Sequence, residues 1–125
     1  MLLYLKFIKI FKIFIDCKNF FFSKPKKADI VIFNTRYGIF ENIITNKSLK
    51  LHHLMHNFSD INLFVVFKVF TNFNIFKINY KENSLKLSSL YFIEYIKSVN
   101  PKLVLTFSDN NLEFYSFKKF TPGIK

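Results

Sequence analysis

Lysines interrupt an otherwise apolar stretch at the start of the chain, three residues apart. On a helix, at 100° per residue, Lys6, Lys9 and Lys12 fall within one polar stripe together with Asp16. Two apolar residues also fall inside that stripe, so the two sides are incompletely separated. The opposite side is apolar, with aliphatic and aromatic residues: Leu3, Phe7, Ile8, Ile10, Phe11, Phe14 and Ile15. The pattern predicts an amphipathic helix over residues 1–23.

Two environments suit such a helix. At a membrane interface, its aromatic side chains would lie among acyl chains and its lysines would meet anionic headgroups. The contact residues expected there are Lys6, Lys9, Lys12, Phe7, Phe11 and Phe14. Alternatively, the apolar side packs on the core of the protein itself or on a partner. We predict interfacial docking; a membrane span or a signal peptide is not expected, because the lysines break the apolar run.

A basic segment follows the predicted helix. Residues 24–27 hold three lysines and Pro25, and a proline disfavours helical geometry at the residue before it. We interpret residues 24–27 as a linker. Residues 28–125 are enough for one compact lobe and too few for two ordinary domains.

Short apolar runs in this lobe indicate strands. Asp29–Asn34 is continuous, β-branched and aromatic, as in strands that parallel sheets bury on both faces. Lys102–Phe107 is a second run of the same kind. We interpret Leu49–His56 as a further strand or extended segment, and Phe73–Tyr80 as an extended piece.

Helical segments alternate with these runs. The segments predicted as helices are Ile39–Thr45, Ile61–Phe70, Leu90–Val99 and Leu112–Phe120. For Ile61–Phe70, propensity by itself favours a strand, and we choose a helix because the preceding cap and the spacing of its apolar residues allow one. Polar residues over 57–60 offer N-cap chemistry for the second, while Ser88 and Ser89 offer it for the third. Pro101 stops the third helix. Strands and helices that alternate with short connections predict an α/β fold.

Polar residues cluster where two of the predicted strands end. Ligands of open α/β sheets bind beyond the carboxyl ends of the strands. The loop after the first strand contains Tyr37 and Gly38. The later strand end supplies hydroxyl, carboxylate and amide groups from Thr106, Asp109, Asn110 and Asn111. These groups could hold a sugar hydroxyl or a phosphate; the simpler alternative is that they only cap the following helix.

The high net charge of the chain is weaker evidence for a nucleic-acid partner than its magnitude suggests. The formal net charge is +11, but 18 of the 19 basic residues are lysine, with Arg36 the one arginine and Ala28 the one alanine. This composition is typical of AT-rich coding, whereas proteins that read nucleic acids favour arginine. Residues 1–27 alone carry a net +6. The charge therefore favours an anionic membrane surface, and nucleic acid is not the partner we expect.

Other chemistry finds little support. Cys17 is the single cysteine, and two glycines are too few for a glycine-rich phosphate loop. On a helix, His52, His56 and Asp60 would share a face that could bind zinc. That stretch is not convincingly helical, and histidines on a half-buried strand explain it more simply. We predict neither a metal site nor a cofactor.

Three stretches are similar to one protein family. Lys24–Phe33 resembles the opening of bacterial surface carbohydrate (capsule or O-antigen) biosynthesis proteins. Tyr95–Asn111, followed by Phe114 and Tyr115, is similar to that family's helix, strand end and next helix. His53–Asn62 resembles the stretch between them. Asn100, the residue before Pro101, departs from the family, which commonly has lysine at this position.

The resemblance implies a partial Rossmann-like parallel sheet with flanking helices, preceded by an amphipathic helix. It would be the amino-terminal lobe of a two-lobed, glycosyltransferase-like enzyme with a nucleotide-sugar or glycan substrate. Thr106, Asp109 and Asn110 match the family's strand-end motif, and no catalytic residue is assigned. Because the family places the donor mainly in its carboxyl-terminal lobe, a second polypeptide would supply that half.

The predicted function is therefore a short or truncated transferase lobe of surface polysaccharide biosynthesis. We expect it to be cytoplasmic and peripheral on the inner face of the plasma membrane. Two rival interpretations stay open. One is a basic, ribosomal-type nucleic-acid-binding protein from an AT-rich genome, and the other is a non-catalytic interaction remnant.

Overall fold

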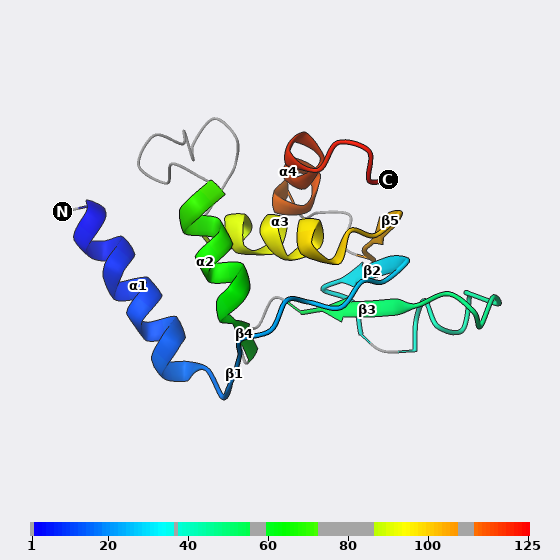
Figure 1. The fold of residues 1–125 in the computed structure, drawn as a ribbon, viewed down its shortest axis with the longest axis horizontal. Coiled ribbons are helices and arrows are strands. Elements are labelled where there is room, and N and C mark those ends of the chain that lie inside the picture. Colours follow the sequence, from blue (N-terminus) through cyan, green and yellow to red (C-terminus); the bar gives the residue numbers. More distant parts are fainter. Residues whose placement is uncertain (1, 37, 56–59, 73–86, 108–111) are drawn as a thin grey trace.

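A computed structural model describes residues 2–36, 38–55, 60–72, 87–107 and 112–125. Its element order is α1 (Leu2–Asp16), β1 (Asn19–Phe21), β2 (Ile30–Phe33), β3 (Leu51–Leu54), β4 (Asp60–Asn62), α2 (Leu63–Asn72), α3 (Leu87–Val99), β5 (Leu103–Leu105) and α4 (Leu112–Phe120). The chain is a mixed α/β protein with small parallel sheets and an amino-terminal helix, which confirms the predicted class (Figure 1).

The larger sheet has three parallel strands in the order β3-β2-β5. All four residues of β2 are buried, as the apolar run predicted. β5 is confirmed as a strand but is only half-buried, because it lies toward one side of the sheet. In addition, the backbone N–H of Lys125 donates to Lys102 O at 3.2 Å, and the backbone N–H of Val104 in β5 donates to Lys125 O at 2.6 Å.

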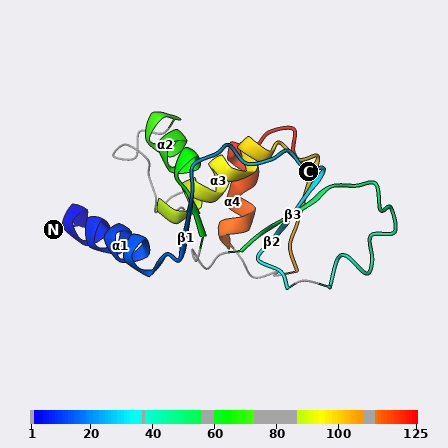
Figure 2. The same cartoon turned by 60° about the horizontal axis from the view of Figure 1, so that its bottom comes forward.

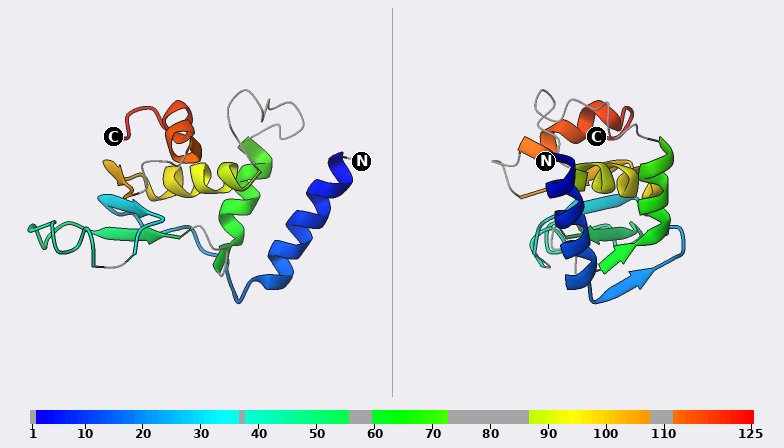
Figure 3. Two further views of the ribbon diagram at one scale, coloured as in Figure 1. Left: turned by 180° about the vertical axis from the view of Figure 1, so that it is seen from behind. Right: turned by 90° about the vertical axis from the view of Figure 1, so that its left-hand side faces the viewer.

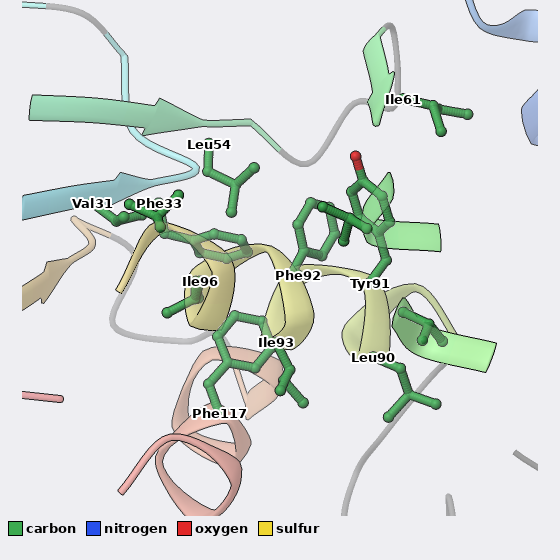
Figure 4. Close-up of a cluster of buried hydrophobic side chains, with 13 residues drawn as sticks. Val31, Phe33, Leu54, Ile61, Leu90, Tyr91, Phe92, Ile93, Ile96 and Phe117 are labelled. Carbon is green, nitrogen blue, oxygen red and sulfur yellow. The ribbon is translucent and has the colours of Figure 1, made fainter. Parts of the chain in front are cut away.

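The main core lies between this sheet and the helices. Phe33 of β2 contacts the aromatic rings of Phe92 in α3 and of Phe117 in α4, at centroid distances of 5.4 and 5.2 Å (Figure 4). Along α3, the buried apolar side chains include Leu90, Phe92, Ile93, Ile96 and Val99. Helices α3 and α4 lie on one side of the sheet, and α2 packs against α3 next to the end of the sheet (Figures 1 and 2).

A second, two-stranded sheet joins the amino-terminal segment to the body. β1 pairs in parallel with β4, and the side chain of Asn19 donates to Asp60 Oδ1 at 2.8 Å. The helix therefore ends at Asp16, and the prediction that it continues toward residue 23 is wrong. Backbone pairing with β4 offers residues 19–21 an alternative to helical hydrogen bonds.

Two further boundaries differ from the predictions. Ile39–Thr45 forms turns and not a helix; the N–H of Ile44 donates to Phe40 O at 2.8 Å, but this single helical turn is not continued. β-branched residues dominate its end and favour helix only weakly. Helix α3 begins before Ser88 and Ser89, so these serines lie inside its first turn. The predicted extended piece Phe73–Tyr80 lies outside the described residues.

Candidate functional site

The carboxyl ends of β2 and β5 lie side by side and are joined by one buried hydroxyl. Thr35 directly follows the bend after β2, and its Oγ1 donates to Phe33 O at 3.1 Å. The same oxygen accepts the backbone N–H of Phe107 at 3.1 Å. Thr106 is half-buried beside this link. At the predicted strand ends, the Thr35 side chain therefore holds together the backbone segments that follow β2 and β5. The sequence did not single out Thr35 as a site residue.

The loop that follows Thr35 is attached to β3 through a carboxylate. Gly38 donates its N–H to Glu41 Oε2 at 2.6 Å, as in half of a capping box. The other carboxylate oxygen of Glu41 pairs with Nε2 of His53. Hydrogen bonds from the backbone of Glu41 and of Gly38, together with His53, hold the pKa of Glu41 below its ordinary value, although partial burial opposes them. The sequence did not predict the pair of Glu41 and His53, because the two residues meet only when β3 lies beside β2.

The two described histidines lie on opposite faces of the sheet. His52 is paired with Val31 and its ring lies 5.3 Å from that of Tyr95 in α3. Burial there lowers the pKa of His52. His53 is paired with Ile32 on the other face. The helical arrangement considered for zinc is therefore wrong, and no three His, Cys, Asp or Glu residues gather among the described residues.

Some predicted ligand residues cannot be placed. Tyr37, Asp109, Asn110 and Asn111 lie outside the described residues. Gly38 is half-buried and takes a φ of 93°, a left-handed conformation that suits glycine. In the described part of the edge, the buried hydroxyl of Thr35 is already bonded to Phe33 O and to the N–H of Phe107, so it fixes the backbone there and does not itself meet a ligand. The half-buried Thr106 and the exposed Phe107 lie beside it, where a sugar hydroxyl or a phosphate oxygen could approach.

The amino-terminal helix has two different apolar sides. Ile13, Phe14 and Cys17 pack against the core, and the Phe14 ring stacks on Phe20 at 6.0 Å. Thus the core-packing alternative holds for one side of α1. The predicted membrane-contact residues with exposed side chains are Phe7, Phe11, Lys9 and Lys12. The side chain of Lys6 is outside those described, and none of the described helices has the length and apolarity needed to cross a bilayer.

Comparison with known proteins adds no relative. Neither a family model, nor a curated protein, nor a solved structure matches this chain.

Proposed function

We propose that this chain is the amino-terminal lobe of a glycosyltransferase-like enzyme of surface polysaccharide biosynthesis, working at the cytoplasmic membrane. The observation that carries the proposal is the joined carboxyl edge of β2 and β5, where Thr35 Oγ1 accepts the N–H of Phe107. The proposal places a sugar or phosphate-bearing ligand at this edge.

The strand order supports this placement. β2 is central, the chain leaves it toward β3 on one side, and β5 lies on its other side. Neighbouring strands whose connections run in opposite directions form the switch point at which open α/β folds bind ligands. A Rossmann-like half-sheet of this order has its switch point between β2 and β5. That is where Thr35 and Thr106 lie.

The groups at the edge suit recognition more than bond making. Hydroxyls and backbone amides can donate to phosphate or sugar oxygens throughout the pH range in which the protein is folded. A transferase also needs a donor site and a base, and the proposal assigns these to a partner lobe. The chain would then contribute the acceptor side of the site.

A titration followed by nuclear magnetic resonance tests this function. Isotope-labelled protein is titrated in turn with a uridine diphosphate sugar, an oligosaccharide and a glycerol phosphate oligomer. We expect saturable shifts of the amide signals of Thr35, Gly38, Thr106 and Phe107 with at least one of them. Thr35→Val should weaken that binding about fivefold, because loss of the hydroxyl removes about 1 kcal/mol of hydrogen bonding that holds the Phe107 backbone in place at the edge.

Thr121→Val is the matched control. Thr121 is also buried, and its hydroxyl donates to Phe117 O at 2.8 Å in α4, so its loss perturbs stability in a similar way. It should leave ligand binding unchanged. Absence of shifts with all three ligands, together with steeply salt-dependent RNA binding at micromolar protein, would instead support the nucleic-acid-binding alternative.

A further inference from the structure

Helix α1 presents an apolar sector that the protein itself leaves uncovered. At 100° per residue, this sector spans an arc of about 100° on the side away from the polar stripe. Its members are Tyr4, Phe7, Ile8, Phe11 and Ile15, all exposed. Tyr4 and Phe11 are 69% and 68% exposed. A different sector, with Ile13, Phe14 and Cys17, contacts the core. Core packing therefore does not account for the aromatic residues of the first sector.

The exposed surface continues beyond the helix. Phe20, Phe21 and Phe22 follow within six residues of its end, and each is exposed, Phe22 by 76%. Figure 3 shows α1 standing away from the body, with β1 at its foot. We call the exposed side chains of α1 and residues 20–22 the aromatic arm. Large contiguous apolar surfaces of this kind mark interaction sites.

The charged residues around the aromatic arm indicate the kind of partner that it binds. Lys9 and Lys12 are exposed along one border of the apolar sector, and Lys18 is exposed beyond the end of α1. The exposed Lys24, Lys26 and Lys27 follow Phe22. Within residues 1–27, Asp16 is the one acidic residue. A partner must therefore combine an apolar interior with a dense negative surface.

We infer that the aromatic arm docks on an anionic lipid bilayer, with its phenyl rings among the upper acyl chains and its lysines at the headgroups. A folded protein partner would need an apolar groove bordered by acids along the whole arm, whereas a bilayer with anionic lipids offers both at every point. At 15 residues, α1 suits the interface and is too short to span. This inference deepens the membrane location in the proposed function, but it rests on residues other than those of the proposed ligand edge.

A single-tryptophan experiment tests where the arm goes. The chain has no tryptophan, so Phe11→Trp introduces one reporter at an exposed position of α1. With vesicles of phosphatidylglycerol and phosphatidylcholine, its emission should move to shorter wavelengths, and brominated acyl chains should quench it. Tyr115→Trp, exposed on α4, is the control and should respond to neither.

Charge reversal tests the electrostatic half of the inference. Lys9→Glu with Lys12→Glu should weaken the vesicle partition coefficient at least about 30-fold, because each lysine near an anionic surface contributes about fivefold. Lys47→Glu with Lys50→Glu changes the net charge equally at the opposite end of the molecule, in the β2–β3 connection (Figures 1 and 3). This control should bind nearly as well as the unmodified chain.

Several outcomes would overturn the inference. They are equal binding to pure phosphatidylcholine, equal losses in the two charge-reversal variants, and a tryptophan emission of the Phe11→Trp variant that does not respond to vesicles. Circular dichroism of each variant confirms that these surface changes leave the fold intact. Because the nuclear magnetic resonance titration uses no lipid, failure of membrane docking and failure of ligand binding remain distinguishable.

Discussion

Tyr91 joins helix α3 to strand β4 through its hydroxyl. Its hydroxyl accepts the backbone N–H of Asn62 at 2.9 Å, and its ring packs edge-on against Phe92 in the core. Burial raises the pKa of Tyr91 to about 12, although the hydrogen bond from Asn62 opposes the rise. Because this phenol stays neutral in the folded state, the free energy of unfolding depends on pH in the alkaline range.

The sign of that coupling is fixed. In the unfolded chain, a tyrosine ionises near pH 10, so between about pH 10 and about 12 the unfolded state binds fewer protons than the folded state. The stability due to neutral Tyr91 is therefore complete below pH 10 and is lost as the pH rises through about 12. The expected loss in unfolding free energy is about 2–3 kcal/mol.

Urea denaturation at pH 8 and pH 11 captures about half of this loss, about 1.4 kcal/mol, because pH 11 lies midway between the unfolded and folded pKa values of Tyr91. Tyr91→Phe should be less stable at pH 8, because Asn62 loses its acceptor, but its stability should fall less between the two pH values. Some pH dependence will remain, since burial also raises the pKa of Tyr95. Parallel declines in the two proteins would show that Tyr91 does not titrate as described.

At the residue scale, sequence predicted kinds of side chain better than their partners. The polar nature of the strand ends and the exposure of Phe7 and Phe11 could be predicted from local pattern. The bond between Thr35 and Phe107 spans 72 positions and exists only because β2 and β5 are neighbours. No local pattern carries that information.

Among the elements, α2 depends on a capping residue with two roles. Asn62 Oδ1 accepts the N–H of Val65 at 3.2 Å, and its Nδ2 donates to Ser23 O at 2.8 Å. The sequence predicted a cap at residues 57–60, and the residue that caps the helix lies just beyond them. β4 occupies 60–62, so the helix starts later than its hydrophobic run suggested.

Asn62→Ala should reduce the unfolding free energy by about 2 kcal/mol, about half from the lost cap and half from the lost bond to Ser23. Asn62→Asp keeps a capping oxygen and loses the donor, so about half of that effect is expected. Urea denaturation at pH 7 measures both. An aspartate variant as unstable as the alanine variant would assign the whole effect to Ser23.

Elements of long or continuous apolar pattern were predicted well. β2, α2, α3, β5 and α4 all lie within a few residues of their predicted places. By contrast, β1 is three residues long and exposed, and it is a strand only because it pairs with β4. Short elements of this kind depend on tertiary pairing more than on propensity.

For the whole molecule, Phe33 is the point where sheet and helices meet. Phe33→Ala should lower the unfolding free energy by about 3–5 kcal/mol, a large share of the stability of a domain of this size. Phe67→Ala is the matched control, because Phe67 is 64% exposed on α2 and its loss should change stability by less than about 0.5 kcal/mol. If the two variants lost comparable unfolding free energy, Phe33 would not be at the centre of the core.

The sequence predicted an α/β class but not the strand order or the two uses of α1. Strand order follows from which strands pair, and several orders satisfy the same alternation of elements. Similarly, the helical pattern of α1 indicated one broad apolar side. Contact with the core divides that side into a covered sector and an exposed one.

The parallel pairing of β1 with β4 also orders events during synthesis. Asn19 leaves the ribosome 41 residues before Asp60, its partner. At about 5–20 residues per second, the nascent chain displays its aromatic start for about 2–8 s before the strand that fixes it has been made. With the docking inferred above, a bilayer near the ribosome would compete with chaperones for this segment before the body of the protein exists. The place of translation would then help to decide where the finished molecule resides.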